Sequence, residues 1–363
     1  MKNKKILVFI YNLKPGGAEG VFVKIANHLY NSGFDVTFVL VQKEGVLLDK
    51  VDNNIDIINL NSKHILLSII PLIKIINTVK PDYILSTLKE NNAIAIISNF
   101  LSRKKAKVFI REANTLSAEL TQGGLLNRII KKYLVKFTYP HADKIIALSN
   151  SMKYDILNFI RSEEKSISVI YNPINQDEIK LLAQENINEQ LFDNEYPIIC
   201  TSARVVPHKG HKVIISAIEL LKAKDRNVNL LCLGDGPDIV SLSEVVNSLG
   251  LEKNIKFIGY VSNPFKYIAN SSIFVLASEY EGMPNSLIQA MSLNIPVIAS
   301  DSPGACSEVL MNGKIGKLFP VGDYKKLAQL IDDTIDNRLK INYKLERFNE
   351  IKILEQYRNL FDD

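Results

Sequence analysis

The chain has 363 residues, which is long for one hydrophobic core, so we expect two domains. Hydrophobic residues make up 47% of it and charged residues 23%, a composition that excludes a largely disordered protein. No apolar stretch has the length of a membrane-spanning helix, because the most apolar window, 65–73, is short and contains Pro71. Residues 1–10 lack a small-residue cleavage site and are expected to form a first strand instead of a signal peptide.

The net charge of +5 is unevenly distributed. Residues 1–175 hold 24 Lys and Arg against 14 Asp and Glu, a net of +10, whereas the remainder holds 20 against 25, a net of −5. We therefore expect only the first half to face an anionic surface or ligand. Cys200, Cys232 and Cys306 show no metal-ligand spacing and indicate buried thiols in a reducing cytoplasm.

Strands and helices alternate through the first half, a pattern typical of a parallel sheet covered by helices. The expected strands are 5–10, 36–41, 55–60, 82–86, 107–110, 144–148 and 168–170, and the expected helices are 17–30, 65–79, 93–101 and 125–138. Asn172 and Pro173 interrupt the pattern, and polar residues with a weak helix follow. We place a first domain at 1–175 and an inter-domain segment at 176–196.

The second half repeats the scheme and predicts a second domain at 197–340. Its expected strands are 198–202, 228–233, 255–258, 273–277, 297–299 and 317–319, and its helices begin near 210, 237, 264, 285, 305 and 323. The last segment, 341–363, is predicted to form a helix that crosses back to the first domain. The predicted fold class is α/β, with two doubly wound Rossmann-like domains facing each other across a cleft.

The stretch 278–291 follows a predicted buried strand, turns through Gly282 and Pro284, and enters a helix. We expect Asn285 to cap that helix, whose free N–H groups attract negative charge. Glu281 lies just outside the helix and is suited to meet ligand hydroxyls. The alternative interpretation is a solvated loop followed by a capped helix.

Three further strand ends carry residues suited to a nucleotide. Arg204 and Lys209 flank a turn before a helix, an arrangement suited to two adjacent phosphates, although such a pair is also common on solvated surfaces. The other residues are Gly234 and Gly236, which allow close approach of a ligand to the backbone, and Phe257 and Tyr260, which end a third strand beside a possible base. Because all four loops end strands of one parallel sheet, they gather at one edge and predict a site for a nucleotide diphosphate that carries a sugar.

The second half resembles the retaining glycosyltransferases of family GT4, which have the two-domain GT-B architecture. The resemblance rests on 202–210, 233–237, 257–260, 281–287, 296–301 and Gly304 with Glu308, and more loosely on 16–19, 142–149 and 170–173. It implies that Arg204 and Lys209 bind the donor diphosphate and that Glu281 contacts the sugar hydroxyls. The amides of Asn285, Ser286 and Leu287 would support the phosphates.

Position 289 departs from this family pattern. Relatives have a second glutamate eight residues after Glu281, which accepts hydrogen bonds from both ribose hydroxyls, but this chain has Gln289. An amide keeps one acceptor oxygen and offers an NH₂ group where the second acceptor was. We therefore expect weaker donor binding without its loss.

Two loops of the first half are expected to face the cleft. One contains the glycine turn at 16–17, and the other, 111–114, follows a strand where relatives place a polar group beside the transferred sugar. The residues expected to line the acceptor or donor-sugar site are Gly16, Gly17, Glu19, Arg111, Glu112 and Asn114. The alternative for 111–114 is an ordinary polar loop.

The resemblance implies a retaining transfer without a metal or another cofactor, most simply from a UDP-sugar to a saccharide or lipid-linked saccharide in cell-surface polysaccharide biosynthesis. The residues assigned to catalysis are Glu281, Arg204, Lys209 and Glu112. Two alternatives stay open: a sugar-nucleotide epimerase of the same fold, and a catalytically weak binding subunit, suggested by Gln289. A dinucleotide oxidoreductase is disfavoured because 15–18 does not fit the glycine pattern of that class. No nucleic-acid partner is expected.

The basic excess is concentrated at 103–107 and in the helix 125–138, where Arg128, Lys131, Lys132 and Lys136 alternate with apolar residues. Such a helix can rest on the anionic inner face of the cytoplasmic membrane, which would make the protein peripheral. An amphipathic helix with a solvated basic face explains the pattern equally well.

Overall fold

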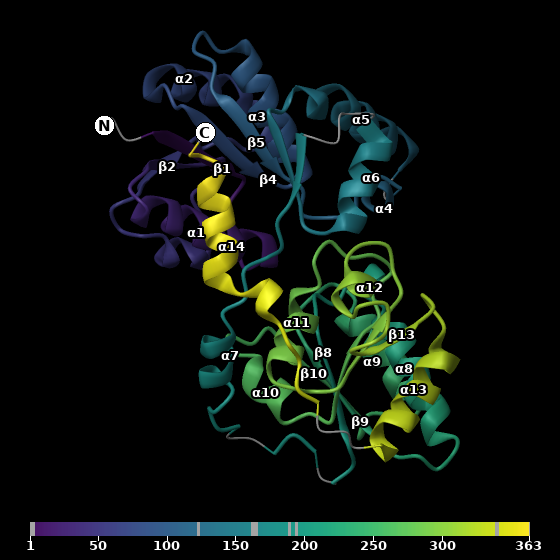
Figure 1. Ribbon diagram of the computed structural model, residues 1–363. Coiled ribbons are helices and arrows are strands. Elements are labelled where there is room, and N and C mark those ends of the chain that lie inside the picture. The colour runs from purple at the N-terminus through teal and green to yellow at the C-terminus, as the bar shows by residue number, and fades with distance from the viewer. Residues whose placement is uncertain are drawn as a thin grey trace. The chain divides into compact units, whose positions relative to one another are not determined.

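The computed structural model describes residues 4–121, 124–160, 166–187, 190–192, 195–337 and 341–362. The chain divides into two compact units (Figure 1). The first is Met1–Pro173 together with Glu350–Asp363, and the second is Ile174–Asn349. No helix in the described ranges is long and apolar enough to span a bilayer.

In the part of the chain that the structure describes, the first unit has a seven-stranded parallel sheet in the order β3-β2-β1-β4-β5-β6-β7. The strand order reverses between β1 and β4, which creates a switch point at the carboxyl ends of these strands. The strands are β1 (Lys5–Ile10), β2 (Asp35–Leu40), β3 (Asp56–Asn59), β4 (Tyr83–Thr87), β5 (Lys107–Arg111), β6 (Lys144–Ala147) and β7 (Ile167–Val169). The α-helices are α1 (Gly17–Asn31), α2 (Ile69–Val79), α3 (Lys89–Leu101), α4 (Leu116–Glu119), α5 (Leu125–Thr138) and α6 (Asn150–Ile160).

The second unit has a six-stranded parallel sheet among its described residues, in the order β10-β9-β8-β11-β12-β13, with a switch point between β8 and β11. Its strands are β8 (Ile198–Ser202), β9 (Asn229–Leu233), β10 (Ile255–Gly259), β11 (Ile273–Leu276), β12 (Val297–Ser300) and β13 (Lys317–Phe319). Its helices are α7 (Gln176–Leu182), α8 (His211–Lys222), α9 (Ile239–Ser248), α10 (Phe265–Ala269), α11 (Asn285–Ser292), α12 (Cys306–Val309) and α13 (Tyr324–Asp336). Two doubly wound parallel sheets confirm the predicted α/β fold class.

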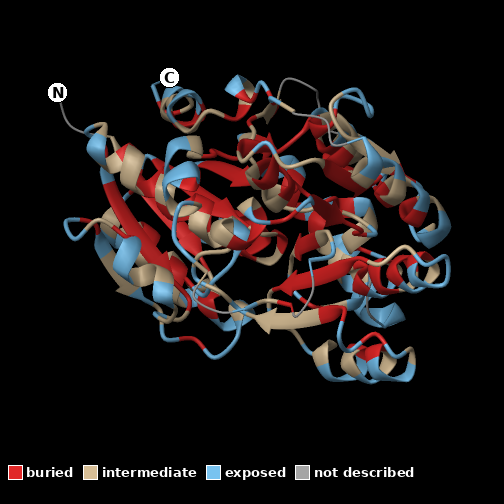
Figure 2. Ribbon diagram, turned by 90° about the horizontal axis from the view of Figure 1, so that it is seen from below, coloured by how far each residue is buried: buried red, intermediate tan, exposed pale blue. Residues whose placement is uncertain are grey.

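The sheets form the centre of each core, because most of their strands are buried while exposure is concentrated in helices and loops (Figure 2). The final helix, α14 (Glu350–Asn359), packs against α1 of the first unit. Beyond it, the Phe361 ring lies 5.2 Å from the rings of both Tyr83 and Phe109. This apolar burial explains why the C-terminal residues group with the first unit.

Four elements differ from the expected pattern. The segment 176–196, expected to lie between the domains, groups with the second unit, where α7 contacts α10 and α11. Helices α4 and α6 were not predicted. Helix α3 begins at Lys89, four residues before its predicted start, because its first turn is polar and lacks the apolar spacing used to find helices.

Candidate functional site

The loops after β8, β9, β10 and β11 meet at the carboxyl edge of the second sheet. Backbone hydrogen bonds join them: Ala203 N–H to Leu233 O (3.0 Å), Val205 N–H to Asp235 O (2.9 Å), Gly234 N–H to Gly259 O (2.8 Å) and Glu279 N–H to His208 O (2.8 Å). The predicted convergence of these loops is therefore present as a single hydrogen-bonded rim.

The glycines of this rim serve its packing. Gly234 has φ +128°, and a Cβ at this position would collide with the Ala203 carbonyl oxygen. A Cβ at Gly236 would meet the Val205 carbonyl oxygen in the same way. These glycines therefore allow the loop after β8 to approach the loop after β9 closely. Their spacing in the sequence did not indicate this role.

Lys209 and Glu281 form an ion pair at the centre of the rim. The Lys209 Nζ lies 2.6 Å from the Glu281 Oε1, and the Ser278 hydroxyl donates to the same oxygen at 2.6 Å. The side chains are only 18% and 9% exposed, so the pair is weakly screened by solvent. Ser300 donates to the Ser278 carbonyl at 2.5 Å and fixes the end of β11. An ammonium and a carboxylate thus stand together, largely enclosed, at the carboxyl edge of the second sheet.

His208 lies between the two cations of the rim. Burial lowers the pKa of His208, and the nearby charges of Lys209 and Arg204 lower it further. Arg204 is exposed and extends from the loop after β8. The His208 ring stacks on Tyr280, with centroids 4.8 Å apart, so the two loops are joined by side chains as well as by backbone.

Helix α11 is capped one residue earlier than predicted. Pro284 occupies the N-cap position and Asn285 is the first helical residue, so the prediction of Asn285 as the cap was wrong. The amides of Asn285 and Leu287 already donate, to Met283 O and Pro284 O. Among the described residues, the Ser286 N–H has no backbone acceptor, so this N–H in the first turn of α11 is available to a ligand.

The remaining predicted donor residues differ in exposure. Leu287 is fully buried and supports α11 from inside, whereas Gln289 is half-buried on the same helix. Phe257 is half-buried at the end of β10 and packs on the core of the second unit. Tyr260, just beyond it, is 63% exposed and free to cover a ligand.

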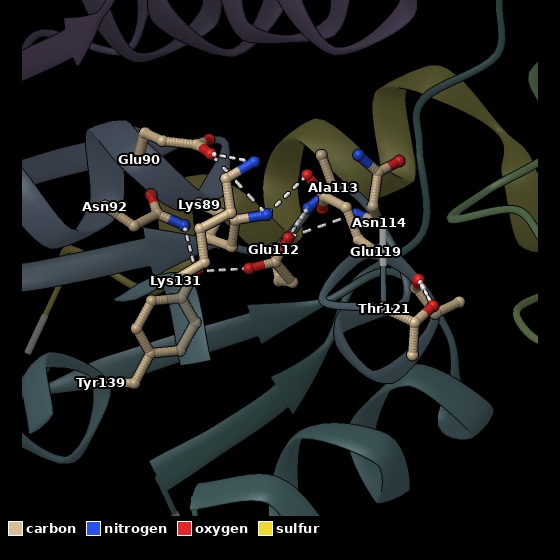
Figure 3. A network of polar contacts seen from close by, with 11 residues as sticks. Lys89, Glu90, Asn92, Glu112, Ala113, Asn114, Glu119, Thr121, Lys131 and Tyr139 are labelled. Carbon is tan, nitrogen blue, oxygen red and sulfur yellow. Dashed lines mark hydrogen bonds and ion pairs between the residues drawn. The ribbon is translucent and has the colours of Figure 1, made fainter. Parts of the chain in front are cut away.

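Glu112 lies in a buried polar network of the first unit (Figure 3). The Tyr139 hydroxyl donates to its Oε2, and the Ala113 and Asn114 amides donate to its Oε1 at 3.0 and 3.3 Å. Asn92 in turn donates to the Tyr139 oxygen at 3.2 Å. Burial raises the pKa of Glu112 to about 8, and the Glu119 charge adds to the rise, so this carboxyl is mostly protonated at neutral pH.

The start of α3 contributes residues to this network that sequence reasoning missed. Lys89 is 2% exposed and pairs with Glu119 at 2.7 Å and with Glu90 at 3.7 Å. Asn92 is fully buried, and the preceding Leu88 has φ +72°, a backbone conformation uncommon for leucine. The signal was available: a polar Lys-Glu-Asn-Asn run begins three residues after the predicted strand 82–86, at the switch point of the sheet.

Arg111 does not line a surface. It is fully buried, and its guanidinium donates to Tyr357 Oη (3.2 Å), Thr87 Oγ1 (2.9 Å) and Asn172 Oδ1 (2.5 Å). The expectation that it lines the acceptor site is corrected by this burial. Arg111 instead ties β5 to β4 and to the C-terminal helix.

The glycine turn at the start of α1 is exposed at Gly16 and Gly17. Gly16 is the N-cap, and the Glu19 carboxylate folds back over it so closely that a Cβ at position 16 would collide with it. A glutamate three residues after the N-cap is the usual place for this interaction. Glu19 therefore supports the turn in the structure.

Two family models match consecutive parts of this chain. Glycosyltransferase Family 4 matches residues 15–178, and Glycosyl transferases group 1 matches residues 183–352. Together with the two doubly wound units, these matches define the class: the chain belongs to the GT4-like glycosyltransferases of GT-B fold. The predicted resemblance is confirmed.

Individual relatives agree with this class. An uncharacterized glycosyltransferase of Methanocaldococcus jannaschii is 31% identical over 247 residues, which are 66% of this chain and 60% of the relative. A Campylobacter jejuni enzyme is 26% identical over 371 residues, 96% of this chain and 97% of the relative; its name is N-acetylgalactosamine-N,N'-diacetylbacillosaminyl-diphospho-undecaprenol 4-alpha-N-acetylgalactosaminyltransferase. Anabaena HepE, solved with UDP and glucose, has the same fold, with a TM-score of 0.81 at 21% identity, covering 99% of this chain and all of that one.

Proposed function

We propose that this glycosyltransferase is retaining and independent of metals and other cofactors, and that its donor is a UDP-sugar. The observation that carries the proposal is the Lys209–Glu281 pair, held by Ser278 at a rim where four strand-end loops are joined. A diphosphate entering this rim would find Lys209 and Arg204, and the sugar beyond it would find Glu281. The UDP complex of Anabaena HepE, which shares the fold, supports the choice of base.

The chemistry follows from the charges at the rim. Two cations stabilise the negative charge that develops on the leaving diphosphate, and the amide of Ser286 can add to this effect. Glu281 accepts hydrogen bonds from sugar hydroxyls and orients the ring. A donor phosphate oxygen takes the proton of the acceptor hydroxyl on the face from which the diphosphate leaves, so no protein nucleophile is needed for retention.

The acceptor is proposed to be a saccharide or a lipid-linked saccharide of cell-surface polysaccharide biosynthesis. Support comes from the Campylobacter jejuni relative, whose name describes a diphospho-undecaprenol acceptor and an α-linked product. An acceptor of this kind would keep the protein at the inner face of the cytoplasmic membrane. In the first unit, the site for it would lie at the loop 111–114, which the buried network around Glu112 and Lys89 supports from inside.

Incubation of the full chain with a panel of sugar nucleotides and membrane lipid extracts tests the proposal by mass spectrometry. We expect a sugar to appear on a lipid or saccharide acceptor with UDP-sugars, and its anomeric configuration to match that of the donor. Conversion of the donor without any acceptor product would favour an epimerase, which the comparisons do not support. Donor binding without any turnover would favour a binding subunit.

A further inference from the structure

Helix α5 presents an apolar face that the first unit leaves uncovered. Its 14 residues include no Asp or Glu, and among its side chains only Val135 and Thr138 are buried. Leu125, Leu126 and Phe137 are 72%, 71% and 67% exposed. Each large side chain left in water forgoes about 1.5–3 kcal/mol of burial, so a face of this kind indicates an interaction surface.

An apolar groove of about 690 Å³ lies between α5 and α3, which are neighbouring helices of the first unit (Figure 1). Ile97 and Phe100 of α3 form one wall, and Ile130, Tyr133 and Phe137 of α5 form the other. Phe100 is itself 70% exposed at the rim of the groove. Its size falls within the range of roughly 300–1,000 Å³ typical of small-molecule pockets, which is enough for hydrocarbon chains to enter.

The segments that carry this groove are rich in positive charge. Residues 100–141 contain nine Lys and Arg against two Asp and Glu, and of those two acids Glu112 is buried and Glu119 pairs with Lys89. The basic residues are Arg103, Lys104, Lys105, Lys107, Arg111, Arg128, Lys131, Lys132 and Lys136. Arg111 is buried and Lys131 pairs with Glu90 of α3, but Lys105 lies over the Phe100 ring of the groove at 5.4 Å, and Arg128, Lys132 and Lys136 are exposed on α5.

We infer that the α3–α5 face docks on an anionic lipid bilayer. The apolar side chains of α5 and the groove would lie at the boundary of the hydrocarbon region, with the lysines and arginines at the headgroups. A second copy of this chain is a poorer occupant, because self-association would bring the exposed cations of two α5 helices together. This inference rests on the proposed function in one respect, the membrane as the partner of the first unit. It does not depend on donor binding in the second unit.

Co-sedimentation with vesicles tests the apolar contribution. Full chain would be mixed with phosphatidylcholine vesicles with and without phosphatidylglycerol, and compared with Leu126→Glu/Phe137→Glu. The matched control is Leu181→Glu/Val240→Glu, which introduces the same charge at positions 67% and 71% exposed in the second unit. We expect binding to anionic vesicles to fall more than about 30-fold in the α5 variant and to stay at the wild-type level in the control.

A second pair of variants tests the charge contribution. Lys132→Glu/Lys136→Glu should weaken binding to anionic vesicles by at least about 30-fold, whereas the control Lys224→Glu/Lys253→Glu, with the same change in net charge, should not. Equal binding of the wild-type chain to neutral and anionic vesicles would overturn the inference. Unchanged binding by both α5 variants would do the same, as would a dimer that these variants dissolve while the wild-type chain binds no vesicles.

Calorimetric titration with UDP on the same samples separates this inference from the proposed function. Folded variants that lose vesicle binding but keep UDP binding support the assignment of the surface. A wild-type chain that binds UDP but no anionic vesicle contradicts the docking surface and leaves the proposed function standing. A chain that binds vesicles but not UDP contradicts the proposed donor.

Discussion

In the second unit, Arg204, Lys209 and Glu281 follow strand ends and remain at the rim of the sheet. In the first unit, Arg111 and Glu112 also follow a strand end, yet both side chains are enclosed, Arg111 completely and Glu112 to 1% exposure. In the second unit Lys209 and Glu281 are also largely enclosed, at 18% and 9% exposure, but they pair with each other at the carboxyl edge of the sheet, and Arg204 is exposed. In the first unit, buried groups pair with these side chains: Thr87 and Asn172 accept from Arg111, and Tyr139 donates to Glu112. A position at a strand end therefore predicts the edge on which a residue lies, but not whether its side chain serves the site or the core.

The largest effect is expected at Lys209. Lys209→Ala removes a cation from the leaving diphosphate and should lower kcat/KM for transfer by about 10²–10³-fold. It also leaves Glu281 buried without its partner, which should lower the free energy of unfolding. The double variant Lys209→Met/Glu281→Gln should recover the stability but not the activity. Transfer near the wild-type rate in Lys209→Ala would mean that this strand-end residue of the second unit does not serve the site either.

Arg111 offers the opposite test. Arg111→Met leaves Thr87, Asn172 and Tyr357 without their donor, and we expect the free energy of unfolding in urea to fall by about 3 kcal/mol or more. Tyr357→Phe removes one of these hydrogen bonds and should lower the free energy of unfolding by about 1 kcal/mol. If Arg111→Met unfolded like the wild-type chain but lost transfer activity, the residue would belong to the site after all.

Glu112 should make stability depend on pH. Its pKa is raised to about 8 in the folded chain, above the unfolded value of 4.5, so the folded state binds more protons between these limits. Stability therefore falls as pH rises through this window, by up to about 1.4 kcal/mol per pH unit. Glu112→Gln should flatten that dependence in urea unfolding at pH 5.5, 6.5 and 7.5. An unchanged slope would mean that Glu112 ionises normally and is exposed to solvent.

The smallest effect is expected at Gln289. Gln289→Glu restores a second acceptor for the ribose hydroxyls, and a charge-assisted bond of this kind should tighten UDP binding by about 10-fold. Titration with 2′-deoxy-UDP is the control, because it lacks one of the two hydroxyls and should gain less. No gain with either ligand would place Gln289 away from the ribose.

The sequence predicted the fold class because buried parallel strands leave continuous apolar runs that helices separate, as in β11 and its neighbours. The rim of the second unit was predictable for the same reason: Arg204, Lys209 and Glu281 stand directly after such runs. Lys89 and Asn92 were missed because the first turn of α3 is polar on all sides and was assigned to a loop. The burial of Arg111 depends on Tyr357, 246 residues away in the chain, and no local pattern reports such a contact.

Calorimetric titration of UDP and of uridine tests the phosphate role of the rim most directly. The wild-type chain should bind UDP more tightly than uridine, because Arg204 and Lys209 are proposed to contact the diphosphate, which uridine lacks. The double variant Lys209→Met/Glu281→Gln removes both charges of the ion pair and leaves no unpaired buried charge, so the chain should stay folded. Its affinity for UDP should fall by more than about 10-fold, while its affinity for uridine stays the same. Equal affinities for UDP and uridine in the wild-type chain, or an equal loss of both in the double variant, would contradict the account.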